Sequence, residues 1–168
     1  MKNNTEPGFL ITFCGIDGAG KSAIVERLKE ELSEEYEQQI YVTKQPSEEV
    51  RKSAVFRAYM DCPCHDGYDY RGLSLMAAAD RIQHFVKDIE PKLQKGDIVI
   101  SDRYFYSCLA NLRARGYVKD KWIYEISRTF IKPDIAFFCD LPVDVAIERV
   151  RARSEECYKY IDILLQYR

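Results

Sequence analysis

The stretch Gly15-Ile16-Asp17-Gly18-Ala19-Gly20-Lys21-Ser22 follows the pattern G-x-x-x-x-G-K-S. It stands between an apolar run, residues 9–14, and a segment with apolar residues at helical spacing, residues 23–32. In this context backbone N–H groups and a helix N-terminus converge on phosphate, while the lysine reaches the terminal phosphates and the serine ligates Mg²⁺. The stretch therefore predicts a site for a nucleoside triphosphate, with the ligands Gly15, Asp17, Gly18, Ala19, Gly20, Lys21, Ser22 and Ala23.

The composition limits the classes of protein and partner to be considered. The 168 residues, with 25 Lys and Arg against 27 Asp and Glu, suit one domain, residues 1–168, and show no basic patch that would bind nucleic acid. No apolar run approaches the ~20 residues of a membrane span, and the N-terminus lacks a signal-peptide pattern. A cytoplasmic protein without a membrane partner is therefore expected. The motif Cys62-Pro63-Cys64-His65 lacks a second ligand pair and is interpreted as a plain loop rather than a zinc site.

Three more short apolar runs, residues 39–43, 97–101 and 135–139, are expected to be strands. Helices are expected at residues 50–59, 73–89, 106–113, 119–130, 142–151 and 158–168, with a polar loop over residues 61–72. Strands that alternate with helices predict an α/β fold, in which helices cover both faces of a central parallel sheet. The chain stops on a helix, so a closing C-terminal strand is expected to be absent, as in a truncated domain with an exposed sheet edge.

The longest predicted helix, residues 73–89, has two distinct faces. The apolar face is expected to form the core stripe, and its members are Leu75, Ala79, Ile82, Val86 and Ile89. A second face carries Ala77, Arg81, His84 and Asp88.

An acid and an arginine, Asp102 and Arg103, follow the third predicted strand directly. In an open α/β sheet, ligands gather at the carboxyl ends of the strands. Beside a phosphate-binding loop, the carboxylate can hold Mg²⁺ and the guanidinium can bind a second phosphate. A simple strand-end salt bridge is the alternative interpretation, and the neighbouring loop argues against it.

Four motifs occur together in this order: Phe13-x-Gly15-x-Asp17-Gly18-x-Gly20-Lys21-Ser22, Ala79-Asp80-Arg81-x-Gln83-His84, Asp102-Arg103-Tyr104-x-x-Ser107 and Pro133-Asp134…Asp140-x-Pro142. As a set they resemble thymidylate kinase, over about residues 9–168. The resemblance implies the three-layer P-loop NTPase fold with a mobile lid. It also implies a nucleoside monophosphate kinase that uses Mg²⁺ to transfer the γ-phosphoryl group of ATP to dTMP or a related pyrimidine nucleotide.

The resemblance also implies roles for individual residues. Lys21 and Ser22 would hold ATP and Mg²⁺, with Asp102 near the metal. In the acceptor site, Asp17 would lie at the sugar, Arg81 at the base and phosphate, and Arg103 at the phosphate. The acceptor-binding segment would span about residues 44–72 and the lid about residues 150–158. The catalytic side chains are then expected to be Lys21, Arg103, Arg149 and Arg153, the last two from a lid cluster that also contains Arg151.

Several positions depart from the family pattern. Lys44 stands where an arginine is usual, which keeps the charge but loses the bidentate fork. Ala77 replaces the phenylalanine that stacks on thymine, and the segment from Ser107 to Asn111 lacks the usual tyrosine and glutamine near the base. Lys44, Ala77, Ser107 and Asn111 are still expected to line the acceptor site. A tyrosine of the loop region, Tyr59, Tyr68 or Tyr70, could replace the stack, although surface tyrosines are the favoured interpretation.

The acceptor and the assembly leave alternatives open. A phosphate acceptor needs no general base, and the end of the second strand reads Lys44-Gln45-Pro46 without an acid, which favours a nucleotide over a nucleoside as acceptor. A nucleoside kinase and a family member that binds nucleotide without turnover remain alternatives. A GTPase-type switch is disfavoured because its guanine motif is missing. Met76 and Phe85 suggest a homodimer formed through the long helices.

Overall fold

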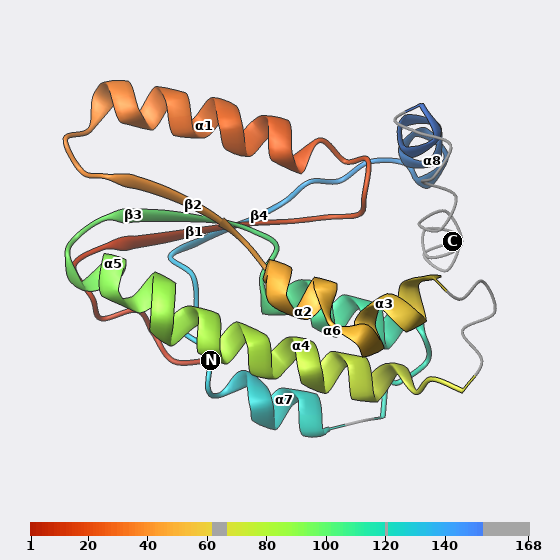
Figure 1. The fold of residues 1–168 in the computed structure, drawn as a ribbon. Helices are drawn as coiled ribbons and strands as arrows, with labels where there is room; N and C mark the ends of the chain where they lie inside the picture. The colour runs from red at the N-terminus through yellow and green to blue at the C-terminus, as the bar shows by residue number, and fades with distance from the viewer. Residues whose placement is uncertain (62–66, 120, 153–168) are drawn as a thin grey trace.

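A computed structural model describes residues 1–61, 67–119 and 121–152 of the chain. Its centre is a sheet of four parallel strands in the order β2-β3-β1-β4 (Figure 1). The strands are β1 (Phe9–Cys14), β2 (Ile40–Lys44), β3 (Ile98–Asp102) and β4 (Ile135–Phe138). The predicted parallel α/β sheet is confirmed, and each strand lies within one residue of its expected place at either end.

The register of the strands brings the chemistry to one edge of the sheet. Phe13 pairs with Asp102, and Lys44 pairs with the same residue from the other side. The phosphate-binding loop begins directly after Cys14, the last residue of β1. It therefore starts beside the charged residues Lys44 and Asp102. Parallel pairing thus places Lys44, Asp102 and the loop at the carboxyl ends of three adjacent strands.

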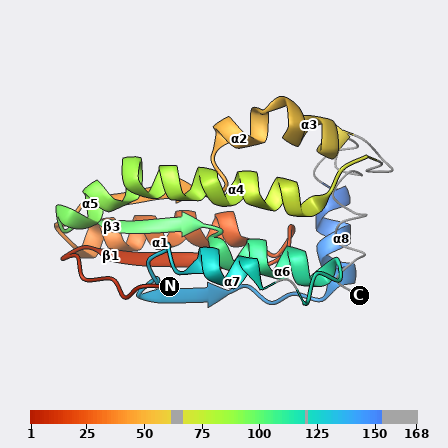
Figure 2. The same ribbon diagram turned by 90° about the horizontal axis from the view of Figure 1, so that it is seen from below.

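Helices lie on both sides of the sheet. The helix α1 (Lys21–Glu35) covers one face, and α4 (Tyr70–His84), α5 (Glu90–Gln94), α6 (Phe105–Ala114) and α7 (Trp122–Ser127) cover the other (Figure 1). Figure 2 shows α3 (Ala54–Asp61) and α8 (Val143–Arg151) at the end to which the strands point. Among the described residues, no helix is long and apolar enough to cross a membrane.

Alternating side chains of β1 pack into two hydrophobic clusters, one on each face of the sheet. Leu10 packs with Phe85, Leu93 and Phe105 on the α4 side, whereas Ile11 packs with other residues beneath α1. This alternation follows from the two-residue period of a strand. The edge strand β4 is different, because its residues are exposed, and Phe138 is 71% exposed.

The predicted core stripe of the long helix is correct at Ile82 and Ile89, which pack in or against the core, and wrong at Leu75, Ala79 and Val86, which are exposed. Leu75 and Val86 are 47% and 54% exposed, while the buried side chains of this segment are Leu73, Ser74, Ala77, Ala78, Arg81, Phe85 and Ile89. Two apolar stripes share the helical period here, and periodicity alone does not tell which one faces the core. A π-helical turn, η1 (Phe85–Ile89), follows α4 and shifts the register, so that Ile89 is fully buried although Val86 is not. Phe85 therefore belongs to the core and not to a dimer surface.

Other helix boundaries also differ from expectation. The predicted helix over 50–59 is two helices, α2 (Glu48–Lys52) and α3, because Ser53 between them has extended backbone angles. The helix α4 begins at Tyr70, three residues early, because the Asp69 carboxylate accepts a hydrogen bond from the Arg71 backbone N–H at 2.8 Å and caps it. The Cys62–His65 motif and the predicted helix over 158–168 lie outside the described residues.

Candidate active site

The loop between β1 and α1 requires its glycines. Gly18 and Gly20 have φ angles of 87° and 85°, which are unfavourable for any residue with a Cβ atom. A Cβ at Gly18 would also lie 2.6 Å from the carbonyl oxygen of Ala146 in α8. The loop therefore packs directly against the first turns of α8, and Arg149 of that helix donates a hydrogen bond to the Gly18 carbonyl oxygen at 3.3 Å.

Lys21 is folded back across the loop. Its side chain is buried, and the ammonium group donates to the Ile16 carbonyl oxygen at 2.7 Å. Burial, together with the nearby Arg103 charge, lowers the pKa of Lys21 to about 8, although the carboxylates of Asp17 and Asp102 act in the opposite direction. An Asp17 oxygen lies 3.9 Å from this ammonium, and the partly compensated buried charge is well suited to receive an anion.

Asp102 and Ser22 face each other at the N-terminus of α1. The Ser22 hydroxyl lies 3.4 Å from one Asp102 oxygen, and the Lys44 ammonium lies 3.6 Å from the same oxygen. The other Asp102 oxygen is buried and has no partner among the described residues. These groups line a small polar cavity of about 80 Å³ next to Lys21. Its hydroxyl and carboxylate oxygens are the donors that Mg²⁺ prefers.

The described residues do not form a complete metal site. No group of three or more His, Cys, Asp or Glu side chains in that part of the chain could hold an ion by itself. Mg²⁺ usually binds through one or two protein oxygens and fills its shell with phosphate oxygens and water. The pair Ser22 and Asp102 fits such an ion.

Arg103 takes an uncommon backbone conformation. Its φ angle is 69°, and it is the one non-glycine residue with positive φ in the described chain. Its guanidinium donates to an Asp17 carboxylate oxygen at 2.6 Å and to the Gly15 carbonyl oxygen at 3.2 Å. Burial would raise the pKa of Asp17, but the charges of Arg103 and Lys21 hold it below its ordinary value. Strain of this kind is typical of functional sites, and here it directs the guanidinium back toward the loop.

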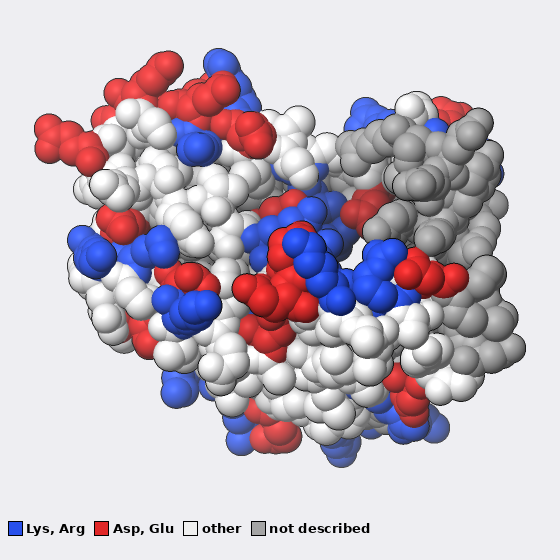
Figure 3. Space-filling model, viewed as in Figure 1, with Lys and Arg blue, Asp and Glu red and all other residues white. Residues whose placement is uncertain are grey.

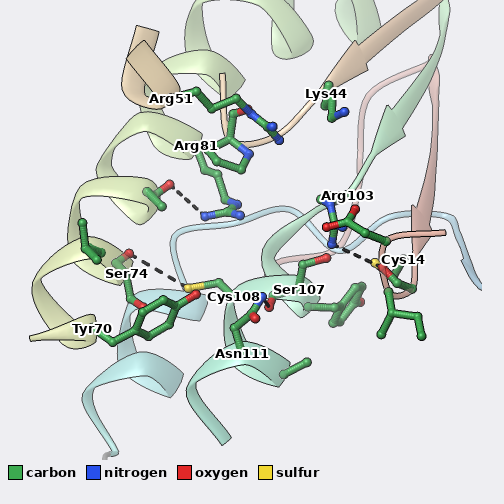
Figure 4. Close-up of a pocket in the computed structure, with 18 of the residues that line it drawn as sticks. Cys14, Lys44, Arg51, Tyr70, Ser74, Arg81, Arg103, Ser107, Cys108 and Asn111 are labelled. Atoms are coloured by element: carbon green, nitrogen blue, oxygen red, sulfur yellow. Dashed lines mark hydrogen bonds and ion pairs between the residues drawn. The ribbon is translucent and has the colours of Figure 1, made fainter. Parts of the chain in front are cut away.

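A second cavity of about 580 Å³ opens beside the loop. Lys44, Arg51, Arg81 and Arg103 surround one end of it, and Tyr70, Ser74, Cys108 and Asn111 lie toward the other (Figure 4). Figure 3 shows basic side chains, with acidic ones among them, around the hollow in the middle of this face. The large cavity therefore has a cationic end next to the loop and an end of aromatic and small polar groups.

Arg81 is the most unusual charge in this cavity. Only 3% of the residue is exposed, and one guanidinium nitrogen donates to the Ala77 carbonyl oxygen at 3.0 Å. Its Nε atom has no partner, and no carboxylate of the described residues forms an ion pair with it. Burial lowers the pKa of Arg81. A buried guanidinium without a carboxylate is costly, and an anionic ligand in the cavity would relieve that cost.

Most residues predicted from the sequence meet at these two cavities. The larger one is lined by Gly15, Asp17, Lys44, Ala77, Arg81, Arg103, Ser107 and Asn111, and the smaller one by Asp17, Gly18, Gly20, Lys21, Ser22, Lys44, Asp102 and Arg103. Ala19 is buried within the loop and Ala23 is exposed on the first turn of α1. Arg151 is exposed at the end of α8, and Arg153 lies outside the described residues.

Sequence reasoning missed Arg51 and misjudged two tyrosines. Arg51 lines the cationic end, and its Nε donates to the Pro46 carbonyl oxygen at 2.8 Å. Its position in the sequence, shortly after the loop that follows the second strand, could have indicated a residue of the site. Tyr59 is 5% exposed and lines the cavity with Tyr70, so neither is the surface tyrosine that the sequence favoured. Tyr68 is exposed, as expected.

The chain is similar to known proteins along nearly its whole length. A family model described as thymidylate kinase matches residues 13–168. A probable thymidylate kinase of Thermococcus kodakarensis is 39% identical over 145 residues, which cover 83% of this chain and 70% of the relative. A thymidylate kinase of Staphylococcus epidermidis is 32% identical, over 87% of this chain and 71% of the relative. The crystal structure of thymidylate kinase from Ehrlichia chaffeensis superimposes with a TM-score of 0.64 at 28% identity, covering 95% of this chain and 82% of that one.

Proposed function

This chain belongs to the thymidylate kinase family, and we propose that it transfers the γ-phosphoryl group of ATP to dTMP, yielding ADP and dTDP. The observation that carries this assignment is Arg81, a buried guanidinium without an ion-pair partner among the described residues, at the cationic end of a cavity next to the phosphate-binding loop. Such a site suits an acceptor that already carries a phosphate.

The donor site is built on the loop between β1 and α1. Lys21 leaves the Ile16 carbonyl to bind the terminal phosphates, and the backbone N–H groups of the loop bind the remaining charge. Arg149, which touches the loop at Gly18, neutralises charge that develops during transfer. Ser22 and Asp102 would hold Mg²⁺. When bound, Mg²⁺ neutralises phosphate charge and orients the group to be transferred.

The acceptor phosphate lies among Lys44, Arg51, Arg81 and Arg103. The two cavities share Asp17, Lys44 and Arg103 in their walls, so donor and acceptor phosphates meet there. The acceptor oxygen is already an anion, which means that the protein supplies positioning and charge neutralisation rather than a general base. The pair Asp17 and Arg103 orients the sugar and phosphate on either side of this point.

The base lies at the opposite end, next to Ala77 and Tyr70. The Arg115 guanidinium already stacks on the Tyr70 ring, 3.8 Å from its centroid, and the Tyr59 ring lies 5.8 Å from the Tyr70 ring. These aromatic groups take the place of the stacking side chain that Ala77 lacks. Ser107 and Asn111 of α6 supply polar groups toward the base.

The protein is further proposed to act as a cytoplasmic homodimer. The apolar stripe left exposed on α4 and η1, namely Leu75, Ala79 and Val86, is the surface through which two long helices would pack. Cys14, Cys108 and Cys139 are free thiols, which suits a reducing compartment.

The acceptor is tested by measuring ADP release with ATP·Mg²⁺ and a panel of dTMP, dUMP, UMP, dCMP, CMP, AMP and GMP. The highest kcat/KM is expected for dTMP. Preference for another nucleotide would make Ala77 and the tyrosines determinants of a different base specificity, and ATP binding without turnover on any member would overturn the proposed activity.

A further inference from the structure

Two side chains one turn apart on α4 hold the segment that joins β2 to α2. The Asp80 carboxylate accepts a hydrogen bond from the Ser47 backbone N–H at 2.7 Å and another from the Ser47 hydroxyl. The two ring nitrogens of His84 contact the same segment, with Nε2 at 2.9 Å from the Thr43 hydroxyl and Nδ1 at 3.2 Å from the Gln45 amide nitrogen. An aspartate and a histidine of one helix thus fix three of five consecutive residues.

The His84 contacts are compatible with a neutral ring. With the Gln45 amide nitrogen as donor to Nδ1, the ring hydrogen is assigned to Nε2, which donates it to Thr43. Burial lowers the pKa of His84, which favours this neutral form, even though the carboxylates of Asp88, Asp80 and Glu49 act against it and Lys92 adds to it. His84 is therefore a neutral, doubly hydrogen-bonded group.

The segment is held from its other side by β3. Gln45 is fully buried, and its backbone N–H donates to the Asp102 carbonyl oxygen at 3.0 Å. Residues 43–47 are consequently clamped between α4 and the strand that ends in the candidate metal ligand. The path of the backbone here is set by polar contacts, since none of Thr43, Gln45 and Ser47 is apolar.

This clamped segment carries two cations of the acceptor site. Lys44 lies between the two clamped residues Thr43 and Gln45, and its ammonium reaches Asp102. The Pro46 carbonyl accepts the hydrogen bond that orients Arg51. The third cation, Arg81, is the neighbour of Asp80 on α4 itself. The same helix therefore supplies one cation directly and sets the place of the other two.

We propose that Asp80 and His84 are positioning residues of the acceptor-phosphate site, which hold Lys44 and Arg51 in register with Arg81 by clamping residues 43–47. The proposal rests on the proposed function, because it assigns the three cations to the phosphate of dTMP. Neither residue lines the cavity, so each acts through the segment and not by touching the nucleotide.

The test compares His84→Leu and Asp80→Ala with the conservative variants His84→Asn and Asp80→Asn, which retain polar atoms toward residues 43–47. Gln83→Ala, an exposed neighbour on the same helix, is the matched control. Calorimetry gives the Kd values of dTMP, thymidine and ATP, and thermal unfolding reports the stability of each variant. His84→Gln, which keeps only the reach toward Thr43, replaces His84→Leu if that variant does not fold.

The disruptive variants are expected to weaken dTMP binding about fivefold to tenfold, as the loss of one or two hydrogen bonds would do. Thymidine, which has no phosphate, and ATP should bind within about twofold of wild type, and the asparagine variants should recover most of the dTMP affinity. Equal losses for dTMP and thymidine, parallel losses for ATP, or unchanged dTMP binding would overturn the positioning role. A wild-type protein that binds dTMP without phosphorylating it would instead overturn the proposed function.

Discussion

At the scale of single residues, the depressed pKa of Lys21 has a consequence for nucleotide binding. With a pKa of about 8 in the free protein, Lys21 loses its proton as the pH rises through that value. Bound phosphates favour the charged form, so ATP binding above about pH 8 must take up a proton. The affinity for ATP is expected to fall about tenfold per pH unit there.

Calorimetry in buffers of different ionisation enthalpy measures this uptake directly. Lys21→Arg, whose side chain stays charged at these pH values, is the control and should bind ATP without the pH dependence. Equal pH dependence in both proteins would show that another group titrates.

Because Arg103 has a positive φ angle, two substitutions at this position distinguish the effect of its backbone conformation on stability from the effect of its side chain. Arg103→Gly and Arg103→Ala both remove the contacts to Asp17 and Gly15, but only glycine relaxes the left-handed conformation. The glycine variant should therefore exceed the alanine variant by about 1 kcal/mol in free energy of unfolding. Both should lose phosphoryl transfer by at least about a hundredfold. Urea unfolding curves check the first statement, and equal stability of the two variants would contradict it.

At the scale of elements, the junction of α3 and α4 supplies the aromatic groups of the base end. Tyr70→Ala should weaken dTMP binding about tenfold, because one base–aromatic stack contributes ~1–3 kcal/mol. The matched control is Tyr68→Ala, since Tyr68 contacts the Tyr59 ring but is exposed and does not line the cavity. Fluorescence titration with dTMP compares the two. Similar losses for both variants would mean that the loss at Tyr70 reflects general loosening of the aromatic cluster.

The positions of the strands could be predicted from the sequence, but the buried face of the long helix could not. Strands β1 and β3 could be placed because short apolar runs ended in chemically distinctive residues, the loop glycines and Asp102. The burial of α4 could not, since Leu75 and Val86 form an apolar stripe as regular as the one that faces the core. The true inner face carries small residues such as Ala77 and Ser74, and their packing depends on α6, far away in sequence.

The residues of the candidate site also fall into those that the sequence predicted and those that it did not. Lys21 and Ser22 begin α1 within the glycine motif, and Asp102 and Arg103 stand at the end of β3, so local sequence placed each pair. Arg51 reaches the site from α2, and the segment that joins β2 to α2 is hydrogen-bonded to Asp80 and His84 of α4. Long-range polar contacts of this kind leave no periodic signal in the sequence.

At the scale of the whole molecule, the exposed stripe on α4 and η1 bears on assembly. Replacing both Leu75 and Val86 with glutamate places charge on a surface that is buried in the proposed homodimer. The double variant should sediment as a monomer at concentrations at which the wild type is dimeric. At concentrations low enough for both proteins to be monomeric, the two should have the same melting temperature. A wild type that is monomeric at the same concentrations, or a double variant that stays dimeric, would contradict this interface.

The cationic cavity is proposed to bind an acceptor that already carries a phosphate. The decisive experiment offers dTMP and thymidine separately with ATP·Mg²⁺ and identifies the products by chromatography. The buried Arg81 and the cations around it predict that dTMP is converted to dTDP while thymidine is left unphosphorylated. Formation of dTMP from thymidine, or no product from either acceptor, would overturn this role of the cavity.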